Sequence, residues 1–371
     1  MKARTIAFYL PQFHPIPEND EWWGKGFTEW INVTKAKPLF PGHYQPHLPA
    51  DLGFYDLRVP EVRDAQAELA RQYGIHGFCY YHYWFNGRRL LERPVNEILA
   101  TGKPDFPFCL CWANENWTRR WDGCEDEVLL AQNYCEEDDL NHIRWLSSVF
   151  KDARYIQIYG KPIFLVYRLS QLPNPARTVE VWRNECRRLG VGEIFICNVE
   201  GAPEQEGLVD RYGLDAAVEF APDWNARPEP IIASEQGFFE KLLANHPRIH
   251  RSLAELGFVV PRRPDQIPLV YDYWSMAEKI MAKKAVSYMR FPCVTPSWDN
   301  TARSAAFITH GSTPDKYERW LKLTVDNAIA KEGEKPVIFI NAWNEWAEGN
   351  HLEPCQKWGR GYLEATRRVL L

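Results

Sequence analysis

The sequence lacks the features that mark membrane proteins, nucleic-acid binders and zinc proteins. Among its 371 residues, no apolar run approaches the roughly 20 residues that a membrane-spanning helix needs. The formal net charge is −5, whereas a general nucleic-acid binder is basic. None of the nine cysteines forms a C-x-x-C pair, so a structural zinc site has little support. We therefore expect no membrane span, no nucleic-acid partner, no metal and no other cofactor.

Signatures of nucleotide binding are missing as well. The turn after the first expected strand reads Leu10-Pro-Gln-Phe-His-Pro15, without the G-x-G-x-x-G pattern that a doubly wound dinucleotide-binding sheet shows there. No Asp-x-Asp element occurs, although many metal-dependent glycosyltransferases use one to hold a metal and a diphosphate. Both absences weaken the interpretation as a nucleotide-sugar glycosyltransferase.

The chain also has no Gly/Ser-rich linker, internal repeat or low-complexity tract, so we expect one domain over residues 1–371. An odd number of cysteines leaves at least one outside any internal disulfide, and reduced thiols in the core fit a cytoplasmic protein. The N-terminus enters a strand at about Thr5, which leaves no room for a signal peptide. We expect a cytoplasmic location.

Strand-like and helix-like segments alternate along the whole chain. Most of the strand candidates are nearly continuous apolar runs, as expected for strands buried on both faces of a parallel sheet. The strand candidates are Thr5–Phe13, Gly77–Trp84, Phe106–Ala113, Pro162–Arg168, Glu193–Val199, Ala216–Ala221, Phe291–Pro296 and Pro336–Asn341. The helix candidates are Pro60–Tyr73, Glu136–Phe150, Pro175–Leu189, Met276–Ala285 and Thr313–Lys331. Eight such strands predict a (β/α)8 barrel, with long insertions at Pro15–Tyr55 and Asp223–Val270.

Polar and aromatic residues follow many of the expected strands. The active site of such a barrel forms at the carboxyl ends of its strands, so these residues are candidates for contact with a substrate. A Tyr or Trp there can equally pack in the core or rim, and a lone histidine such as His82 can be structural. The candidate substrate-binding residues are Tyr81, His82, Trp84, Trp112, Asn114, Glu115, Trp298, Asp299, Trp343, Asn344 and Trp346.

The segment Asn341–Gly349 places two carboxylates, Glu345 and Glu348, three residues apart at the end of the last expected strand. In an extended strand such residues point to opposite faces, whereas in a helical turn they share one side. For both acids to reach one substrate, the strand must end near Asn344 and turn over Glu345–Gly349. Glycoside cleavage needs a proton donor and a second carboxylate, and desolvation or a neighbouring carboxylate keeps one acid protonated near neutral pH. Glu345 and Glu348 are therefore the predicted catalytic pair.

The chain resembles WbsX-type proteins of bacterial polysaccharide gene clusters over nearly its whole length. The resemblance is carried by Ala7–His14, Trp22–Gly24, Gly26–Trp30, Gly77–Trp84, Trp112–Trp117 and Asn344–Gly349. That group is often labelled glycosyltransferase. It is also similar to glycoside hydrolase family 99, the endo-α-mannosidases and endomannanases, which are metal-independent (β/α)8 barrels.

The resemblance implies roles for the two acids, because family 99 carries an Asn-Glu-Trp-x-Glu-Gly motif that matches Asn344–Gly349. Glu345 would take the proton of the substrate 2-hydroxyl, and oxygen 2 would attack the anomeric carbon to form a 1,2-anhydro sugar. Glu348 would protonate the leaving oxygen and later activate water, with net retention. The route requires a 2-hydroxyl trans to the leaving group, as in α-mannosides and α-rhamnosides.

The expected function is that of a retaining α-glycosidase or transglycosidase acting on a bacterial oligosaccharide or polysaccharide, or on its precursor. A glycosyltransferase of O-antigen or other surface-polysaccharide biosynthesis is the alternative. A catalytically silent sugar-binding protein is a third interpretation, against which the intact acid pair stands.

Overall fold

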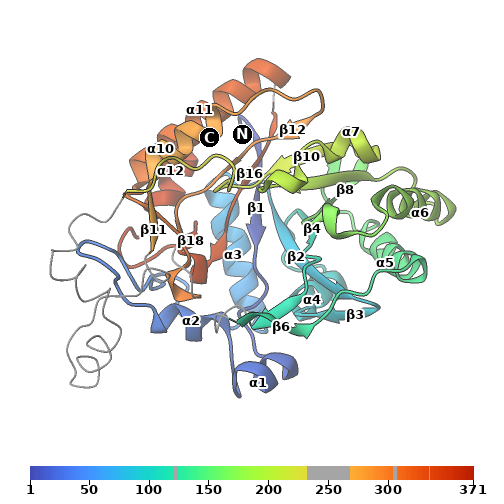
Figure 1. Cartoon of the computed structure of the whole chain (residues 1–371), viewed down its shortest axis with the longest axis horizontal. Helices are drawn as coiled ribbons and strands as arrows, with labels where there is room; N and C mark the ends of the chain where they lie inside the picture. The colour runs from blue at the N-terminus through green and yellow to red at the C-terminus, as the bar shows by residue number, and fades with distance from the viewer. Residues whose placement is uncertain (120–123, 232–267, 304–306, 334) are drawn as a thin grey trace.

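The computed structural model describes residues 1–119, 124–231, 268–303, 307–333 and 335–371. Its main sheet is a parallel barrel whose path runs β12-β10-β9-β8-β4-β2-β1-β16-β13 (Figure 1). The strands of this path are β1 (Arg4–Tyr9), β2 (Gly77–Phe85), β4 (Phe108–Trp112), β8 (Lys161–Val166), β9 (Phe195–Glu200), β10 (Ala216–Glu219), β12 (Arg290–Phe291), β13 (Cys293–Val294) and β16 (Val337–Ile340).

The sheet returns on itself because its two end strands are consecutive pieces of the chain. β12 pairs with β10 and β13 pairs with β16, and only Pro292 separates them. A proline has no backbone N–H to donate to a neighbouring strand, so the pairing is interrupted there. The Pro292 carbonyl still accepts from Phe339 N at 2.9 Å. With β12 and β13 counted as one interrupted strand, the predicted eight-stranded α/β barrel is confirmed.

Helices cover the outside of the barrel between successive strands (Figure 1). The predicted helices are present as α3 (Pro60–Gln72), α5 (Glu136–Val149), α6 (Pro175–Arg188), α10 (Tyr273–Met281) and α11 (Pro314–Glu332). Helices that were not predicted are α1 (Pro17–Trp23), α2 (Glu29–Lys35), α4 (Arg93–Thr101), α7 (Leu208–Tyr212) and α12 (Gly361–Leu370). Short 3-10 turns are η2 (Leu169–Gln171), η3 (Pro203–Gln205), η5 (Asn300–Ala302) and η6 (Trp346–Glu348).

Smaller strands decorate the barrel rim. β3 (Arg88–Leu90) and β7 (Gln157–Ile158) pair antiparallel with β2 and β8. β5 (Trp117–Arg119) with β6 (Cys124–Leu130), and β17 (Asn344–Glu345) with β18 (Asn350–His351), form two antiparallel pairs. β11 (Leu269–Asp272), β14 (Trp298–Asp299) and β15 (Phe307–His310) form a separate three-stranded sheet. Most of the insertion predicted at Asp223–Val270 lies outside the described residues.

The insertion predicted at Pro15–Tyr55 is observed after β1, which ends at Tyr9, four residues before its predicted end. It folds over the barrel rim through α1 and α2. The Trp30 ring of α2 packs 5.5 Å from Trp346 in η6, and Trp30 Nε1 donates to the Tyr55 carbonyl at 2.8 Å. The segment therefore lies beside the turn that carries the acid pair.

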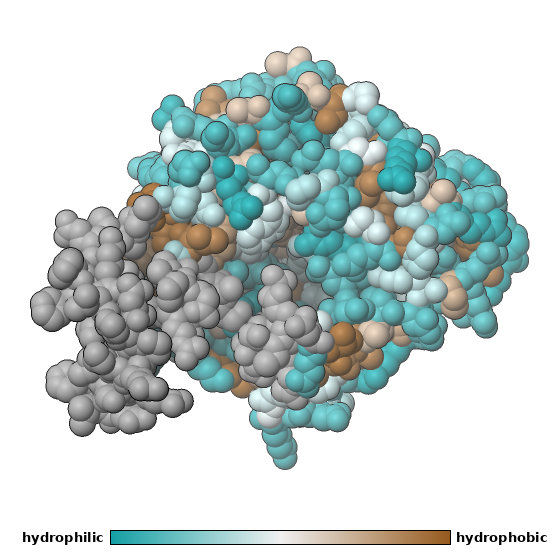
Figure 2. Space-filling model, in the orientation of Figure 1, coloured by the Kyte–Doolittle hydropathy of each residue, from teal (hydrophilic) through white to brown (hydrophobic). Residues whose placement is uncertain are grey.

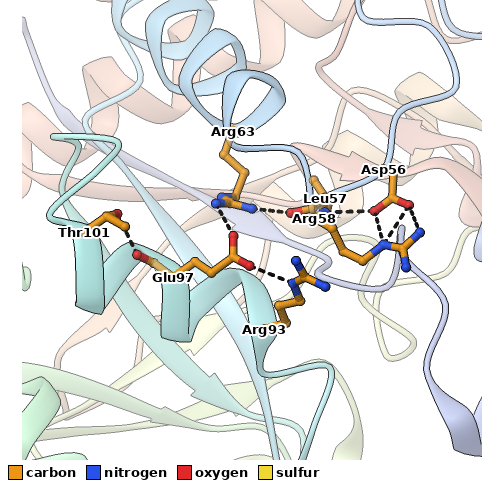
Figure 3. Close-up of polar contacts among 7 residues, drawn as sticks. All are labelled: Asp56, Leu57, Arg58, Arg63, Arg93, Glu97 and Thr101. Carbon is orange, nitrogen blue, oxygen red and sulfur yellow. Dashed lines mark hydrogen bonds and ion pairs between the residues drawn. The ribbon is translucent and has the colours of Figure 1, made fainter.

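A buried arginine fixes the end of this insertion to two barrel helices (Figure 3). Arg63 of α3 donates to the Leu57 carbonyl, and its Nη2 lies 2.5 Å from Glu97 Oε2 in α4. Arg93 contacts the other oxygen of the same carboxylate at 2.7 Å from a more exposed position. The charge of Arg63 is balanced by Glu97 where water is scarce.

Figure 2 shows one face that is largely hydrophilic, with apolar side chains scattered in small groups. Seven of the eight cysteines whose side chains the structure describes are buried, and all eight are free thiols, in line with the predicted reduced core. Among the described residues, no helix is long and apolar enough to cross a lipid bilayer.

Candidate active site

A cavity of about 920 Å³ opens at the carboxyl ends of the barrel strands. Its wall combines residues from the ends of β1, β2, β4, β8, β10 and β13 with the turn after β16. The acids Glu345 and Glu348 both line it. Of the predicted substrate-binding residues, Tyr81, Glu115 and Trp298 line it as well. The volume lies within the range of about 300–1,000 Å³ that is usual for small-molecule sites in proteins.

The two acids share the cavity because the chain turns sharply after β16. Glu345 is the last residue of β17, and η6 follows over Trp346–Glu348. Gly349 then has φ 55°, and a Cβ atom at that position would lie 2.9 Å from Asp299 Cβ. Only glycine fits this left-handed position against β14 without strain. The predicted turn over Glu345–Gly349 is therefore confirmed.

Asn344 fastens this turn to the end of β1. Its Oδ1 accepts from Leu10 N at 2.7 Å, and its Nδ2 donates to the Leu10 carbonyl at 3.0 Å. A side-chain amide can satisfy one N–H and one carbonyl at once, which an aspartate could not do. The residue before the first acid thus positions the pair.

Arg303, which follows η5, connects both acids. Its Nη1 lies 2.5 Å from Glu348 Oε1, and its Nη2 lies 3.1 Å from Glu345 Oε2. The same Nη2 lies 3.2 Å from Oε2 of Glu29, a fully buried carboxylate of α2. One guanidinium therefore faces three carboxylates, and its rigid fork of donors suits it to bridge them.

The surroundings favour a proton on this cluster. Burial, and then the neighbouring Glu348, raise the pKa of Glu345 to about 8, although Arg303 pulls in the opposite direction. Burial raises the pKa of Glu29. Burial alone would lower the pKa of Arg303, but Glu29, Glu348 and Glu345 raise it well above its ordinary value. A permanently charged arginine among carboxylates of raised pKa is an arrangement suited to acid–base work.

Glu353 forms hydrogen bonds to aromatic side chains that pack beside the turn carrying the acid pair. It accepts hydrogen bonds from Trp346 Nε1 at 2.7 Å, from the Tyr55 hydroxyl at 2.8 Å and from Gln66 Nε2 at 2.6 Å. Burial raises the pKa of this carboxyl to about 7. Trp346 is also stacked on His351 with ring centroids 3.8 Å apart, so its ring is fixed from two sides.

Three predicted substrate-binding residues point away from the cavity. On β2, Tyr81 and Tyr83 face the cavity, whereas the alternate residues His82 and Trp84 pack against α5. His82 Nε2 lies 3.0 Å from His142 Nε2, and Trp84 Nε1 donates to Asp138 at 2.9 Å. Trp112 on β4 also packs against His142. Residues that alternate along a strand point to opposite faces, so we assign these three to packing outside the barrel.

The remaining predicted residues support the site from within the fold. Asn114 is fully buried and hydrogen-bonded to the backbone of Arg168. Asp299 lies 2.5 Å from His43 Nε2 and so holds the insertion after β1. Trp343 packs on Phe78, with ring centroids 5.0 Å apart. Together with Asn344 and Trp346, these side chains orient the cavity wall and do not line the cavity.

The sequence reasoning missed Arg303, Glu29, Tyr83 and Arg168. Arg303 lies only four residues after Asp299, a predicted substrate-binding residue, and a buried acid pair requires a cationic or hydrogen-bonding partner. Glu29 lies inside Gly26–Trp30, one of the segments that carry the family resemblance. Strand alternation from Tyr81 would have indicated Tyr83.

A model of the family described as "Glycosyltransferase WbsX" matches residues 5–366. The chain belongs to this family. A relative of this WbsX-family chain is the uncharacterized protein WxcX of Xanthomonas campestris pv. campestris strain B100, which is 43% identical over 376 residues. The match covers 100% of the present chain and 50% of WxcX, so the chain spans about half the length of this relative.

Solved structures share the fold of this WbsX-family chain at low sequence identity. The GH99 endo-alpha-mannosidase of Bacteroides thetaiotaomicron, in complex with bis-tris propane, is 14% identical, with a TM-score of 0.57, over 99% of this chain and 95% of that one. A structure described as a glycoside hydrolase-like protein is 13% identical, with a TM-score of 0.58, over 100% and 94% of the two chains. The fold is therefore GH99-like.

Proposed function

We propose that this WbsX-family protein is a retaining α-glycosidase, or a transglycosidase, that works through a 1,2-anhydro sugar intermediate. The observation that carries the proposal is that Glu345 and Glu348 line one cavity and are bridged by Arg303. The GH99-like fold and the Asn344–Gly349 motif support the same chemistry. The chain's location in the cytoplasm remains part of the proposal.

The exposure of the two acids supports the roles assigned to them, with Glu345 as the base and Glu348 as the proton donor. The Glu345 side chain is 5% exposed, whereas that of Glu348 is 18% exposed. Glu348 is thus placed to meet the leaving group and then water, which must enter from solvent. Glu345 needs only to contact the substrate 2-hydroxyl, which a deeply buried position allows.

The proposed reaction has two steps. Glu345 takes the proton of the 2-hydroxyl while oxygen 2 attacks the anomeric carbon, and Glu348 donates its proton to the leaving glycosidic oxygen. In the second step, Glu348 removes a proton from water, which opens the three-membered ring, and Glu345 returns its proton to oxygen 2. Two inversions give net retention. A sugar acceptor in place of water would give transfer.

The substrate class follows from this chemistry. Attack by oxygen 2 requires a trans relation between the 2-hydroxyl and the leaving group, which α-mannosides and α-rhamnosides provide. The aromatic residues at the cavity wall, among them Tyr81, Tyr83 and Trp298, offer flat faces on which sugar rings stack. We propose a manno- or rhamno-configured bacterial polysaccharide or its precursor as the substrate.

Two substitutions test the division of labour. Glu348→Gln should abolish cleavage of an α-manno- or α-rhamno-configured glycan but should still release the phenol of an aryl glycoside whose leaving group needs no protonation, followed by slow opening of the anhydro sugar because water has lost its base. Glu345→Gln should abolish both, and a 2-deoxy substrate should be inert with the wild-type protein. Glu180→Gln, an exposed carboxylate of α6 outside the cavity, is the matched control. Unchanged glycan cleavage by Glu348→Gln would remove the proposal.

Sugar transfer from a nucleotide donor is the second candidate, which the family description favours. A screen of nucleotide sugars with an acceptor glycan, with and without Mn²⁺, separates the two. The glycosidase proposal expects no release of nucleoside diphosphate in either condition. Release that depends on Glu345 and Glu348 would assign the same site to transfer.

A further inference from the structure

Arg168 is a second cation in the wall of the cavity, and its surroundings differ from those of Arg303. It follows β8 and lines the cavity. Asn114 holds its backbone from both sides, since Oδ1 accepts from Arg168 N at 2.8 Å and Nδ2 donates to the Arg168 carbonyl at 2.9 Å. The Arg168 guanidinium carbon lies 4.5 Å from the centre of the Tyr167 ring. The side chain is therefore held in place before any ligand arrives.

The guanidinium of Arg168 has spare donors. Its Nε lies 3.0 Å from Glu115 Oε1, and among the described residues no acceptor is within hydrogen-bonding distance of Nη1 or Nη2. Arg303, by contrast, bridges three carboxylates. The Arg168 side chain is 17% exposed, and its partner Glu115 is 39% exposed. A fixed, mostly buried arginine with both terminal nitrogens available matches a carboxylate or phosphate in bidentate geometry.

The position of Arg168 connects it to the acid pair along the cavity wall. Its stacking partner Tyr167 meets Tyr81 edge-on, with ring centroids 6.1 Å apart. Tyr81 lies near enough to Glu345 and Glu348 for both charges to act on its hydroxyl. A sugar lying across these two tyrosine rings would extend from the acid pair toward the guanidinium.

We propose that Arg168 binds an anionic substituent, a carboxylate or a phosphate ester, on the glycan that occupies this cavity. The inference rests on the proposed function to the extent that the cavity must bind sugar. It adds that the substrate is an acidic glycan. Glu115 balances the charge of Arg168 in this structure, and its exposed position lets it turn to solvent when the anion of the substrate replaces it.

A matched set of ligands tests the proposal by titration followed by NMR. The probes are methyl α-D-mannopyranoside, its 6-carboxylate counterpart and its 6-phosphate, which differ only at carbon 6. At least one of the charged probes should bind about tenfold more tightly than the neutral one, as expected for a charge-assisted bidentate contact. The charged probe that binds more tightly identifies the anion as carboxylate or phosphate.

Substitutions at the two residues assign the effect. Arg168→Gln should remove the preference for charged probes, whereas Arg168→Lys should keep a smaller one and covers the case in which the glutamine variant does not fold. Glu115→Gln should increase the preference, because the competing carboxylate is gone. Equal binding of neutral and charged probes by the wild-type protein, or a preference that survives in both Arg168 variants, would overturn the inference.

The results distinguish failure of the acidic-glycan site at Arg168 from failure of the proposed glycosidase function. If the wild-type protein binds charged probes through Arg168 but cleaves no glycoside, the acidic-glycan site stands and the glycosidase proposal falls. If it cleaves neutral glycans in a Glu348-dependent way without any preference for charge, the reverse holds.

Discussion

At the scale of single residues, the arrangement around Arg303 decides how the acid pair behaves. Three carboxylates share one guanidinium in a space with little water. If all three were ionised, the cluster would carry two uncompensated negative charges, which a buried site resists strongly. The cluster therefore retains protons into the neutral range, and Glu345 has a pKa of about 8.

This raised pKa predicts the pH dependence of catalysis. As a base, Glu345 must be ionised while Glu348 keeps its proton, so kcat/KM should have a rising limb governed by a pKa near 8, well above the ordinary carboxyl value of 4.5, and should fall once Glu348 loses its proton. Arg303→Gln removes a cation that lowers this pKa, so it should move the rising limb to still higher pH. The measurement is kcat/KM against pH for both proteins. A profile that does not rise below pH 8, or a rising limb that Arg303→Gln leaves in place, would contradict the assignment of Glu345 as the base.

The residue scale also shows where sequence reasoning stopped. The motif Asn344–Gly349 indicated both acids and the turn beneath them, because the spacing of the acids and Gly349 carry that information. The residues that surround the two acids were predicted less well. Position after a strand does not distinguish Tyr81, which lines the cavity, from His82, which packs on α5; that choice depends on which face of β2 is turned inward. Arg303 was missed because its partners lie 42, 45 and 274 residues away.

At the scale of secondary-structure elements, the buried strands were predictable and the short ones were not. Each expected strand of the barrel is found, because a strand buried on both faces is a nearly continuous apolar run. β1 ends early at Tyr9 because the backbone of Leu10 is hydrogen-bonded to the Asn344 side chain and not to a neighbouring strand. Helices such as α4 and α12, nine and ten residues long, were missed.

The joint between α3, α4 and the insertion after β1 gives an element-scale prediction (Figure 3). Arg63→Ala should lower the free energy of unfolding by about 3 kcal/mol, because it leaves the Leu57 carbonyl and Glu97 without their buried donor. Arg93→Ala removes a 53% exposed partner of the same carboxylate and should cost less than about 0.5 kcal/mol. Urea unfolding of the two variants checks the contrast, and equal losses would contradict it.

At the scale of the whole molecule, buried ionisable groups of both kinds are spread through the fold. Burial lowers the pKa of His14 and His47 to about 4 and that of His82 to about 3, and it also lowers the pKa of His142 and His351. Burial raises the pKa of Glu345 to about 8, Glu353 to about 7 and Asp139 to about 6. The histidines lie just before and within the insertion, on β2, on α5 and on β18, so the effect belongs to no single element.

These shifts predict a maximum of stability near neutral pH. The histidines stabilise the fold fully above their ordinary pKa of 6.5, and this contribution is lost as pH falls toward 4, because only the unfolded chain takes up the protons. The acids contribute fully below their ordinary values, and their contribution is lost as pH rises through 7 and 8. Each proton changes the free energy of unfolding by about 1.4 kcal/mol per pH unit.

Thermal unfolding from pH 4.5 to 9 should therefore give the highest Tm at about pH 6.5 to 7. Glu345→Gln should flatten the alkaline side and steepen the rise of Tm below pH 6.5, because the contribution of Glu345 is lost over the whole interval from pH 4.5 to about 8. A Tm that rises steadily to pH 9 would contradict the assignment of these acids as protonated in the fold.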